Sequence, residues 1–307
     1  MTIIERYSAP KQLLILLIVL IASVFILTPL GILIAIPFVD GDILVLLQQM
    51  ELAETAQDIA LLKYFQIISQ LSLFIASSFA FAFLVAKKPW RYLGLDKMPS
   101  LKLIVIAIVI GLVSSPFLDW VMHVNYNMHL PAFLSSLENW MRQMEEEASE
   151  LTNLFLSGDT VSTLLVNLFM MALLAGLGEE LLLRGITQPL FIRITKNAHW
   201  GIWIAAALFS FMHLQFLGFF PRLLLGALFG YYYYWSKNLW IPITAHIANN
   251  GIIVVYTFFY GTEASGLQIG AVKPEESPSV FLIVLSLSLS IAGLMFFYRE
   301  STIQKQE

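Results

Sequence analysis

The chain has 307 residues, of which 58% are hydrophobic and only 12% are charged, and its net charge is -4. Soluble domains carry about 25% charged residues, so the composition excludes an ordinary soluble protein and indicates a membrane protein that contacts the lipid bilayer. The small negative charge offers no basic surface for nucleic acid. The absence of cysteine excludes disulfides, a thiolate nucleophile and metal sites with cysteine ligands.

Apolar runs long enough to cross a bilayer, about 20 residues each, recur along the chain. Their length, without alternating polarity, favours helices over β-strands. We therefore expect an all-α, polytopic transmembrane helix bundle that forms a single membrane domain over residues 1–307. About eight spans are predicted, at residues 12–38, 62–86, 101–123, 160–188, 200–219, 221–236, 240–261 and 279–298.

Charged residues between the spans predict their orientation, because loops rich in Lys and Arg stay in the cytoplasm. Eight spans with cytoplasmic N and C termini place most basic loop residues on that side: Lys87, Lys88, Arg91, Lys97, Arg193, Lys196, Lys237, Arg299 and Lys305. Acidic residues then fall on the other side: Asp40, Asp42, Glu51, Glu54, Glu145, Glu146, Glu147 and Glu150. The exceptions to this pattern are Arg142, Arg222 and Lys273.

Residues 136–156 differ from the spans. Apolar residues recur there at helical spacing opposite a charged face, which predicts an amphipathic helix. We expect this helix to lie on the outer membrane surface or over the end of the bundle, or else to be a solvated loop helix.

Three charged residues lie within two helical turns of the fourth span: Glu179, Glu180 and Arg184. A charge at this depth costs about 2.5–3.5 kcal/mol or more, so an ionisable residue inside a span is a candidate for function. Glu180 and Arg184 are four residues apart and can form an intrahelical salt bridge. Glu179 is rotated by about 100° from Glu180 and has no local partner, which suits a general base.

Further polar residues lie in later spans. His213 is in the fifth span, with Phe209 one turn before it, and His246 and Asn250 share one face of the seventh. Each alone has a structural explanation, such as a hydrogen bond between helices. Together with a free carboxylate they favour a functional site, expected to open toward the cytoplasmic half of the bilayer. Two other titratable residues compete for a role, near the outer end of the third span: Asp119 and His123.

These residues resemble the motifs of the CPBP family of intramembrane proteases, which includes the type II CAAX prenyl endopeptidases and the Abi proteins. The motifs E-E-x-x-x-R, F-x-x-x-H and H-x-x-x-N correspond to Glu179–Arg184, Phe209–His213 and His246–Asn250. The resemblance covers residues 160–255, which we expect to be the catalytic core. Residues 1–150 carry no signature of this family.

The resemblance implies an intramembrane endopeptidase that hydrolyses a peptide bond of a membrane-associated protein or peptide. It implies that Glu179 is the general base that activates water. It also implies that His213 and His246 position the water or the scissile carbonyl, and that Asn250 donates a hydrogen bond to the oxyanion. The expected location is a prokaryotic cell membrane.

Three residues are expected to support this site. The resemblance implies that Glu180 and Arg184 hold the helix geometry, and Phe209 is placed to fix the ring of His213. We expect no cofactor, because no H-E-x-x-H motif pre-forms a zinc site. Zinc is the alternative, since two histidines and one glutamate are also a catalytic ligand set; the ligands would be Glu179, His213 and His246.

Two other classes of function remain open. One is a non-proteolytic membrane partner, such as an immunity protein. The other is a transporter whose polar cluster is a proton or substrate site, although the chain shows no internal repeat of the kind that many transporters have. Gly226 and Gly230 form a G-x-x-x-G motif, which we expect to pack inside the bundle rather than between two chains.

Overall fold

The computed structural model describes residues 7–38, 55–261 and 277–303, and every regular element within these ranges is helical. Six of the described helices are long and apolar enough to cross a bilayer: Ala9–Phe38, Ala56–Val85, Leu101–Tyr126, Val161–Thr195, Trp240–Tyr260 and Val280–Ile303. The all-α, polytopic helix bundle expected from the sequence is confirmed, and the chain is an integral membrane protein.

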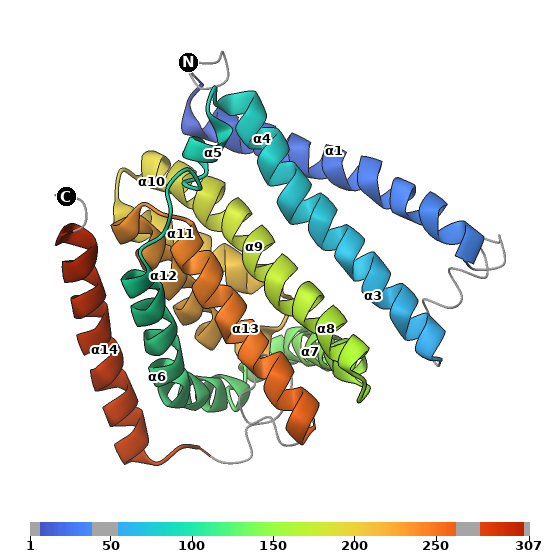
Figure 1. Ribbon diagram of the computed structural model, residues 1–307. Helices are drawn as coiled ribbons and strands as arrows, with labels where there is room; N and C mark the ends of the chain where they lie inside the picture. The colour runs from blue at the N-terminus through green and yellow to red at the C-terminus, as the bar shows by residue number, and fades with distance from the viewer. Residues whose placement is uncertain (1–6, 39–54, 262–276, 304–307) are drawn as a thin grey trace.

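The elements follow one another in a simple order (Figure 1). Their bounds are α1 Ala9–Ala35, η2 Ile36–Phe38, α3 Ala56–Gln70, η3 Leu71–Ala76, α4 Ser77–Val85, α5 Pro89–Tyr92, α6 Leu101–Tyr126, η4 Ala132–Leu134, α7 Ser135–Leu156, α8 Val161–Asn167, η5 Leu168–Leu174, α9 Ala175–Glu180, η6 Leu181–Thr187, α10 Gln188–Thr195, α11 Ala198–Met212, η7 Phe216–Gly218, α12 Phe219–Ser236, α13 Trp240–Tyr260 and α14 Val280–Ile303. Several consecutive elements form one continuous helix, as α8 to α10 do.

Two of the eight predicted spans are less clear in the structure. The ranges 200–219 and 221–236 correspond to α11, with 15 residues, and α12, with 18, which pack against each other. At about 1.5 Å per residue α11 is shorter than the hydrocarbon core of a bilayer, about 30 Å. A buried arginine, Arg222, and the aromatic end of α12 lower the mean hydropathy of that helix. The number of spans therefore stays a prediction.

π-helical segments interrupt two of the long helices. η3 separates α3 from α4, while η5 and η6 flank α9. Such segments change the direction of the side chains that follow them and occur often at functional sites. The short α9, which carries Glu179 and Glu180, therefore lies between two of these irregularities.

The fourth span is longer than predicted. The helix that contains the predicted range 160–188 continues past residue 188 to Thr195. Pro189 occupies the first turn of α10, directly after the π-helical η6. The proline is tolerated inside this continuous helix because it follows a π-helical turn, where the regular α-helical hydrogen bonding is already interrupted.

The helices form a central group with a long helix at each edge. α1 packs on η3, α4 and α10, and α14 packs on α6, so that these two helices lie at opposite edges of the bundle (Figure 1). Large apolar side chains point outward from both, including Phe25 with 75% of its surface exposed and Val280 with 76%. Continuous apolar surface of this kind fits contact with lipid.

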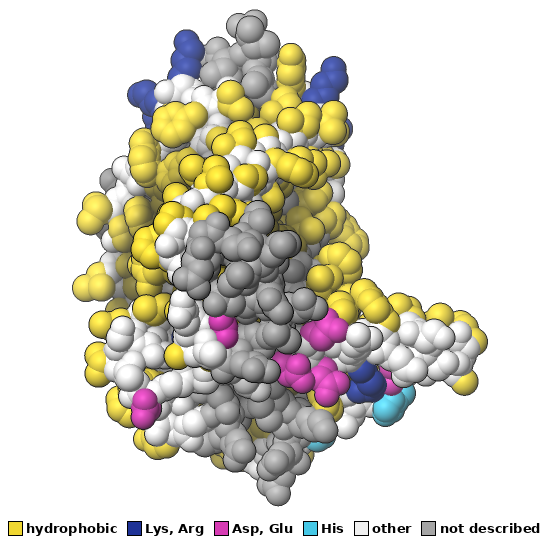
Figure 2. Space-filling model, turned by 90° about the vertical axis from the view of Figure 1, so that its right-hand side faces the viewer, with side chains coloured by type: hydrophobic (Ala, Val, Ile, Leu, Met, Phe, Trp, Pro, Cys, Tyr) yellow, Lys and Arg dark blue, Asp and Glu magenta, His cyan; other side chains and the backbone are white. Residues whose placement is uncertain are grey.

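Charges separate toward the two ends of the bundle. Figure 2 shows Lys and Arg side chains at the top of one face, apolar side chains across its middle, and most Asp and Glu lower down. At the basic end, Arg193 on α10 donates to Gln12 on α1. Asn238, before α13, donates to the carbonyl oxygen of Lys97, before α6. Six residues used for the orientation lie outside the described residues: Asp40, Asp42, Glu51, Glu54, Lys273 and Lys305. Sidedness stays a prediction.

The segment predicted as an amphipathic helix, residues 136–156, lies in α7. The ring of Trp140 is 5.2 Å from that of Phe216, in the connection between α11 and α12. α7 therefore covers one end of the α11–α12 pair. Its contact with a membrane surface stays a prediction.

The G-x-x-x-G motif packs inside the chain, as expected. A Cβ atom added at Gly226 would lie 2.9 Å from Cδ1 of Phe209, and one at Gly230 would lie 2.7 Å from Oε1 of Gln188. Both glycines therefore let α12 approach the neighbouring helices α11 and α10 closely.

Candidate active site

Two glycines bring α9 close to its neighbours on both sides. A Cβ atom at Gly176 would lie 2.7 Å from Cγ1 and 3.0 Å from the backbone N of Ile247, on α13. A Cβ atom at Gly178 would lie 2.8 Å from Cβ of Phe74, in η3. The side chains of α9 can therefore reach α13 on one side and line a space beside η3 on the other.

We expect Gly176→Ala to lower activity and stability together. The added methyl would meet the backbone of α13, which cannot move without displacing His246, and overpacking of this kind costs about 1–3 kcal/mol. The predicted peptidase activity and the thermal unfolding midpoint measure the effect. Gly251→Ala, on α13, is the matched control, because the nearest atoms to its Cβ are side-chain carbons at 3.8 Å. If Gly176→Ala and Gly251→Ala lost the same activity and stability, this result would contradict the close approach of α9 to α13 at Gly176.

Glu180 is the centre of a buried ionic cluster. Its Oε1 accepts hydrogen bonds from Nη1 of Arg184 at 2.8 Å and from Nδ1 of His246 at 3.0 Å. The Glu180 and Arg184 side chains are 0% and 1% exposed. The predicted Glu180–Arg184 salt bridge is confirmed, and Glu180 also orients His246, which the spacing did not predict.

Arg184 also contacts α11 and α12. Its Nη2 donates to the carbonyl oxygen of Gly226 at 2.8 Å, and its Cζ lies 4.8 Å from the centroid of the Phe209 ring. A buried guanidinium that is paired and in contact with an aromatic face can remain charged in an apolar bundle. Arg184 thus connects its own helix to α11 and α12.

His246 lies between the two carboxylates. Its ring stacks on Phe229, with centroids 5.0 Å apart and an interplanar angle of 27°, and meets the Phe209 ring edge-on. Since Nδ1 is bound to Glu180, the other nitrogen is directed toward Glu179, with 4.0 Å between Nε2 and Oε2 of Glu179. The structure therefore brings Glu179, Glu180 and His246 together.

Glu179 lines a cavity of about 280 Å³. Its Oε2 is buried and has no hydrogen-bond partner within the part of the chain that the structure describes. The cavity lining comes from three helical regions, α3–η3, α9–η6 and the end of α11: Gln66, Ser69, Gln70, Leu73, Phe74, Glu179, Leu183, Phe209, Met212 and His213. A free carboxylate oxygen at such a cavity can bind water or a substrate donor.

His213 lines the same cavity and is fixed by its own helix. Its Nδ1 donates to the carbonyl oxygen of Phe209 at 2.9 Å, and the two rings meet edge-on with centroids 5.0 Å apart. A neutral ring with its proton on Nδ1 keeps Nε2 as an acceptor. The next residue, Leu214, has a φ of 53°, a left-handed conformation that is rare for leucine and occurs often at functional sites.

The connection after His213 is held by two residues whose role the sequence did not reveal. Arg222, with 1% of its surface exposed, donates to both the carbonyl and the side-chain oxygen of Gln215. Glu145, on α7, accepts from the backbone N–H of Leu217 at 2.8 Å. Burial raises the pKa of Glu145, which Arg222 opposes. The one available signal was Arg222 itself, a cation inside an apolar run.

Asn250 makes different contacts. Its Nδ2 donates to the carbonyl oxygen of Met171 at 3.0 Å, and its Oδ1 accepts from Asn249. Met171 lies in η5, where the helical pairing is irregular and a carbonyl oxygen can take an outside donor. Asn250 thus links α13 to the fourth span and is not among the residues that line the cavity. Its role as an oxyanion donor stays a prediction.

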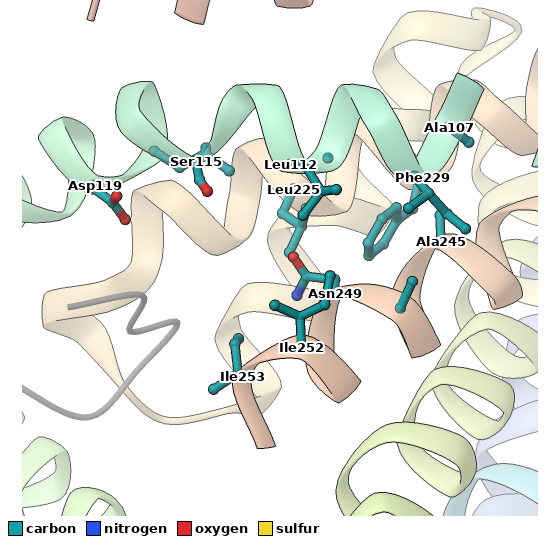
Figure 3. Close-up of a pocket in the computed structure, with 14 residues that line it drawn as sticks. Ala107, Leu112, Ser115, Asp119, Leu225, Phe229, Ala245, Asn249, Ile252 and Ile253 are labelled. Carbon is teal, nitrogen blue, oxygen red and sulfur yellow. The ribbon is translucent and has the colours of Figure 1, made fainter. Parts of the chain in front are cut away.

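The competing residue Asp119 lines a separate cavity of about 50 Å³ between α6, α12 and α13. Figure 3 shows Asp119 and Ser115 on α6 at one end of this space and Asn249 on α13. Phe229 borders it and also stacks on His246. Neither Glu179 nor His213 lines this second cavity, so the structure does not join Asp119 to the predicted site.

A preformed zinc site does not appear among the described residues, since no three His, Asp or Glu side chains there are placed to hold a metal ion. The alternative ligands were Glu179, His213 and His246. Nδ1 of His246 is bound to Glu180, and Nδ1 of His213 is bound to the Phe209 carbonyl oxygen. Metal dependence stays a prediction.

Comparison with known proteins matches the segment that carries these side chains. Residues 161–252 match the family described as type II CAAX prenyl endopeptidase Rce1-like. This segment is similar to the Rce1-like family. The Rce1-like segment contains Glu179, His213, His246 and Asn250, and it lies within the range 160–255 expected for the catalytic core.

The chain also resembles a protein from Bacillus subtilis (strain 168), described as uncharacterized protein YpbD. The two are 31% identical over 84 residues, which cover 26% of this chain and 40% of YpbD. The match therefore spans less than half the length of that relative. No solved structure matches the chain.

Proposed function

We propose that this protein is an intramembrane endopeptidase that hydrolyses a peptide bond of a membrane-associated protein or peptide. One observation carries the proposal: Glu179 and His213 line the same cavity of about 280 Å³, and Oε2 of Glu179 has no partner among the described residues. A carboxylate in this state is available as a general base for water. The Rce1-like match supports a peptidase.

In the proposed reaction, a water molecule in the cavity donates one hydrogen bond to Glu179 and the other to Nε2 of His213. The water oxygen attacks the scissile carbonyl carbon while Glu179 takes a proton. The C–N bond then breaks, and the proton passes to the leaving amine nitrogen. General base catalysis of this kind contributes about 10²–10⁴-fold to the rate.

The charges around Glu179 support the transfer of this proton. Glu180 and Arg184 neutralise each other within one buried pair. One proton on either Glu179 or His246 then makes the whole cluster neutral, which a medium of low polarity favours. Because Nε2 of His246 is 4.0 Å from Glu179, a small movement would let the two share this proton.

Two further parts of the proposal depend on the family resemblance and the charge pattern. Asn250 stabilises the oxyanion, for which its Nδ2 must leave the Met171 carbonyl oxygen. The basic end of the bundle and both termini face the cytoplasm, and the site opens toward that half of the bilayer. The Bacillus relative supports a prokaryotic origin, for which the membrane would be the cell membrane.

Substrate discovery tests the proposed function. Membranes that contain the wild-type protein or Glu179→Gln are compared by mass spectrometry for new N-termini of membrane-associated proteins. New termini that appear only with the wild-type protein support the endopeptidase. Identical sets of termini, with an unchanged cellular phenotype, would instead favour a non-proteolytic membrane partner.

We also propose that catalysis needs no metal. The purified protein is expected to contain less than one zinc per chain and to keep its activity in strong chelators, because no three His, Asp or Glu side chains among the described residues are placed to hold a metal ion. Metal analysis and the cleavage rate before and after chelation measure this. Stoichiometric zinc that is lost together with activity, and restores activity when added back, would establish the zinc alternative.

A further inference from the structure

Part of the site cavity is formed by a segment outside the family match. Gln66, Ser69 and Gln70, all on α3, line the cavity with Glu179 and His213. The Rce1-like match begins only at residue 161. These three polar side chains therefore need an explanation that the family motifs do not supply.

Gln70 is the most informative of the three. Only 7% of its surface is exposed, and its Oε1 is buried without a hydrogen-bond partner among the described residues. Buried polar atoms in proteins are nearly always hydrogen-bonded. Because Gln70 lines the cavity that contains Glu179, the missing partner is expected to come from what enters that cavity.

A glutamine side chain is the hydrogen-bonding complement of a peptide group, since its carboxamide offers one acceptor oxygen and two donors. A substrate whose scissile bond lies at Glu179 must place neighbouring peptide groups along the same cavity. Gln66 lies one helical turn before Gln70 on the same face of α3 and adds a second carboxamide.

We propose that Gln70 binds the backbone of the substrate peptide. Its Oε1 accepts the N–H of a peptide group next to the scissile bond, and its Nε2 donates to a carbonyl oxygen of the same chain. This contact sets which peptide bond faces Glu179. The inference rests on the proposed function and adds a substrate-binding residue from the N-terminal half of the chain.

Backbone esters test this contact directly. The probe is an internally quenched peptide with a C-terminal CAAX sequence and an S-farnesyl cysteine. Two analogues replace the peptide N–H directly before or directly after the scissile bond by an ester oxygen. For the wild-type protein, one ester is expected to lower kcat/KM by about 10-fold, because it leaves Oε1 of Gln70 unpaired. Gln70→Met is expected to lose a similar factor on the normal peptide, mainly through KM.

The decisive result is the combination of the two changes. Gln70→Met should show no further loss of kcat/KM when the normal peptide is replaced by the sensitive ester. The variant already lacks the Oε1 atom that accepts the peptide N–H. Gln188→Met is the matched control: Gln188 is 1% exposed and its Oε1 also lacks a partner among the described residues, but it does not line the cavity. Gln188→Met should lose the same factor in kcat/KM with the ester as the wild-type protein does. Thermal unfolding confirms that each variant is folded.

Two results would overturn the inference: a wild-type KM for Gln70→Met, or the same loss with the ester in Gln70→Met as in the wild-type protein. Glu179→Gln distinguishes this failure from failure of the proposed function. If Glu179→Gln is inactive while Gln70→Met has a wild-type KM, only the role of Gln70 is wrong. If Glu179→Gln cleaves the probe at the wild-type rate, the part of the proposed function that makes Glu179 the general base is wrong.

Discussion

Glu179→Gln is expected to reduce peptide cleavage by about 10²–10⁴-fold, the range for loss of a general base. The amide keeps the shape of the side chain but cannot take a proton from water. The loss should appear in kcat, with little change in KM, because the substitution removes an interaction needed in the transition state. Initial rates with the quenched peptide measure both constants.

The same substitution should leave the protein folded. Oε2 of Glu179 has no hydrogen-bond partner among the described residues, so no bond of that atom is lost. The thermal unfolding midpoint and the elution volume in detergent should match those of the wild-type protein. Wild-type kcat in a folded Glu179→Gln variant would rule out Glu179 as the base.

Glu180→Gln, one residue further on, is expected to act mainly on stability. Glu180 is fully buried and accepts hydrogen bonds from Arg184 and His246. Removing its charge leaves the Arg184 guanidinium buried without a counterion, and breaking a buried pair in this way costs about 3–5 kcal/mol. The free energy of unfolding in denaturant measures the loss.

A double-mutant cycle separates the ion pair from other effects. Replacing both partners, as in Glu180→Leu with Arg184→Met, removes the two charges together and should cost less than the sum of the two single changes. If the double variant lost the sum of the unfolding free energies lost by the two single variants, Glu180 and Arg184 would not act as a unit. A Glu180→Gln variant as stable as the wild-type protein would contradict the buried cluster.

Local spacing explains why some contacts could be predicted. Glu180 and Arg184, and Phe209 and His213, are each four residues apart on one helix, and helix geometry brings such side chains together in any surrounding. Both contacts are present in the structure.

Contacts between helices could not be predicted in this way. The hydrogen bond from His246 to Glu180 requires that α9 and α13 approach closely, which Gly176 permits. Asn250 contacts the Met171 carbonyl oxygen because the π-helical η5 alters the pairing there. A single sequence contains neither the distance between two helices nor their rotation.

By itself, the sequence determined that the chain is a bundle of membrane helices, which three helices carry the motif residues, and that Glu179 and Glu180 differ in their local partners. These features depend on composition and on spacing within one helix. Only the tertiary structure decided that Glu180 accepts hydrogen bonds from both Arg184 and His246, and that Glu179 lines the same cavity as His213 and Gln70. Those relations depend on the packing distance and rotation of separate helices, which side-chain contacts along the whole bundle set together.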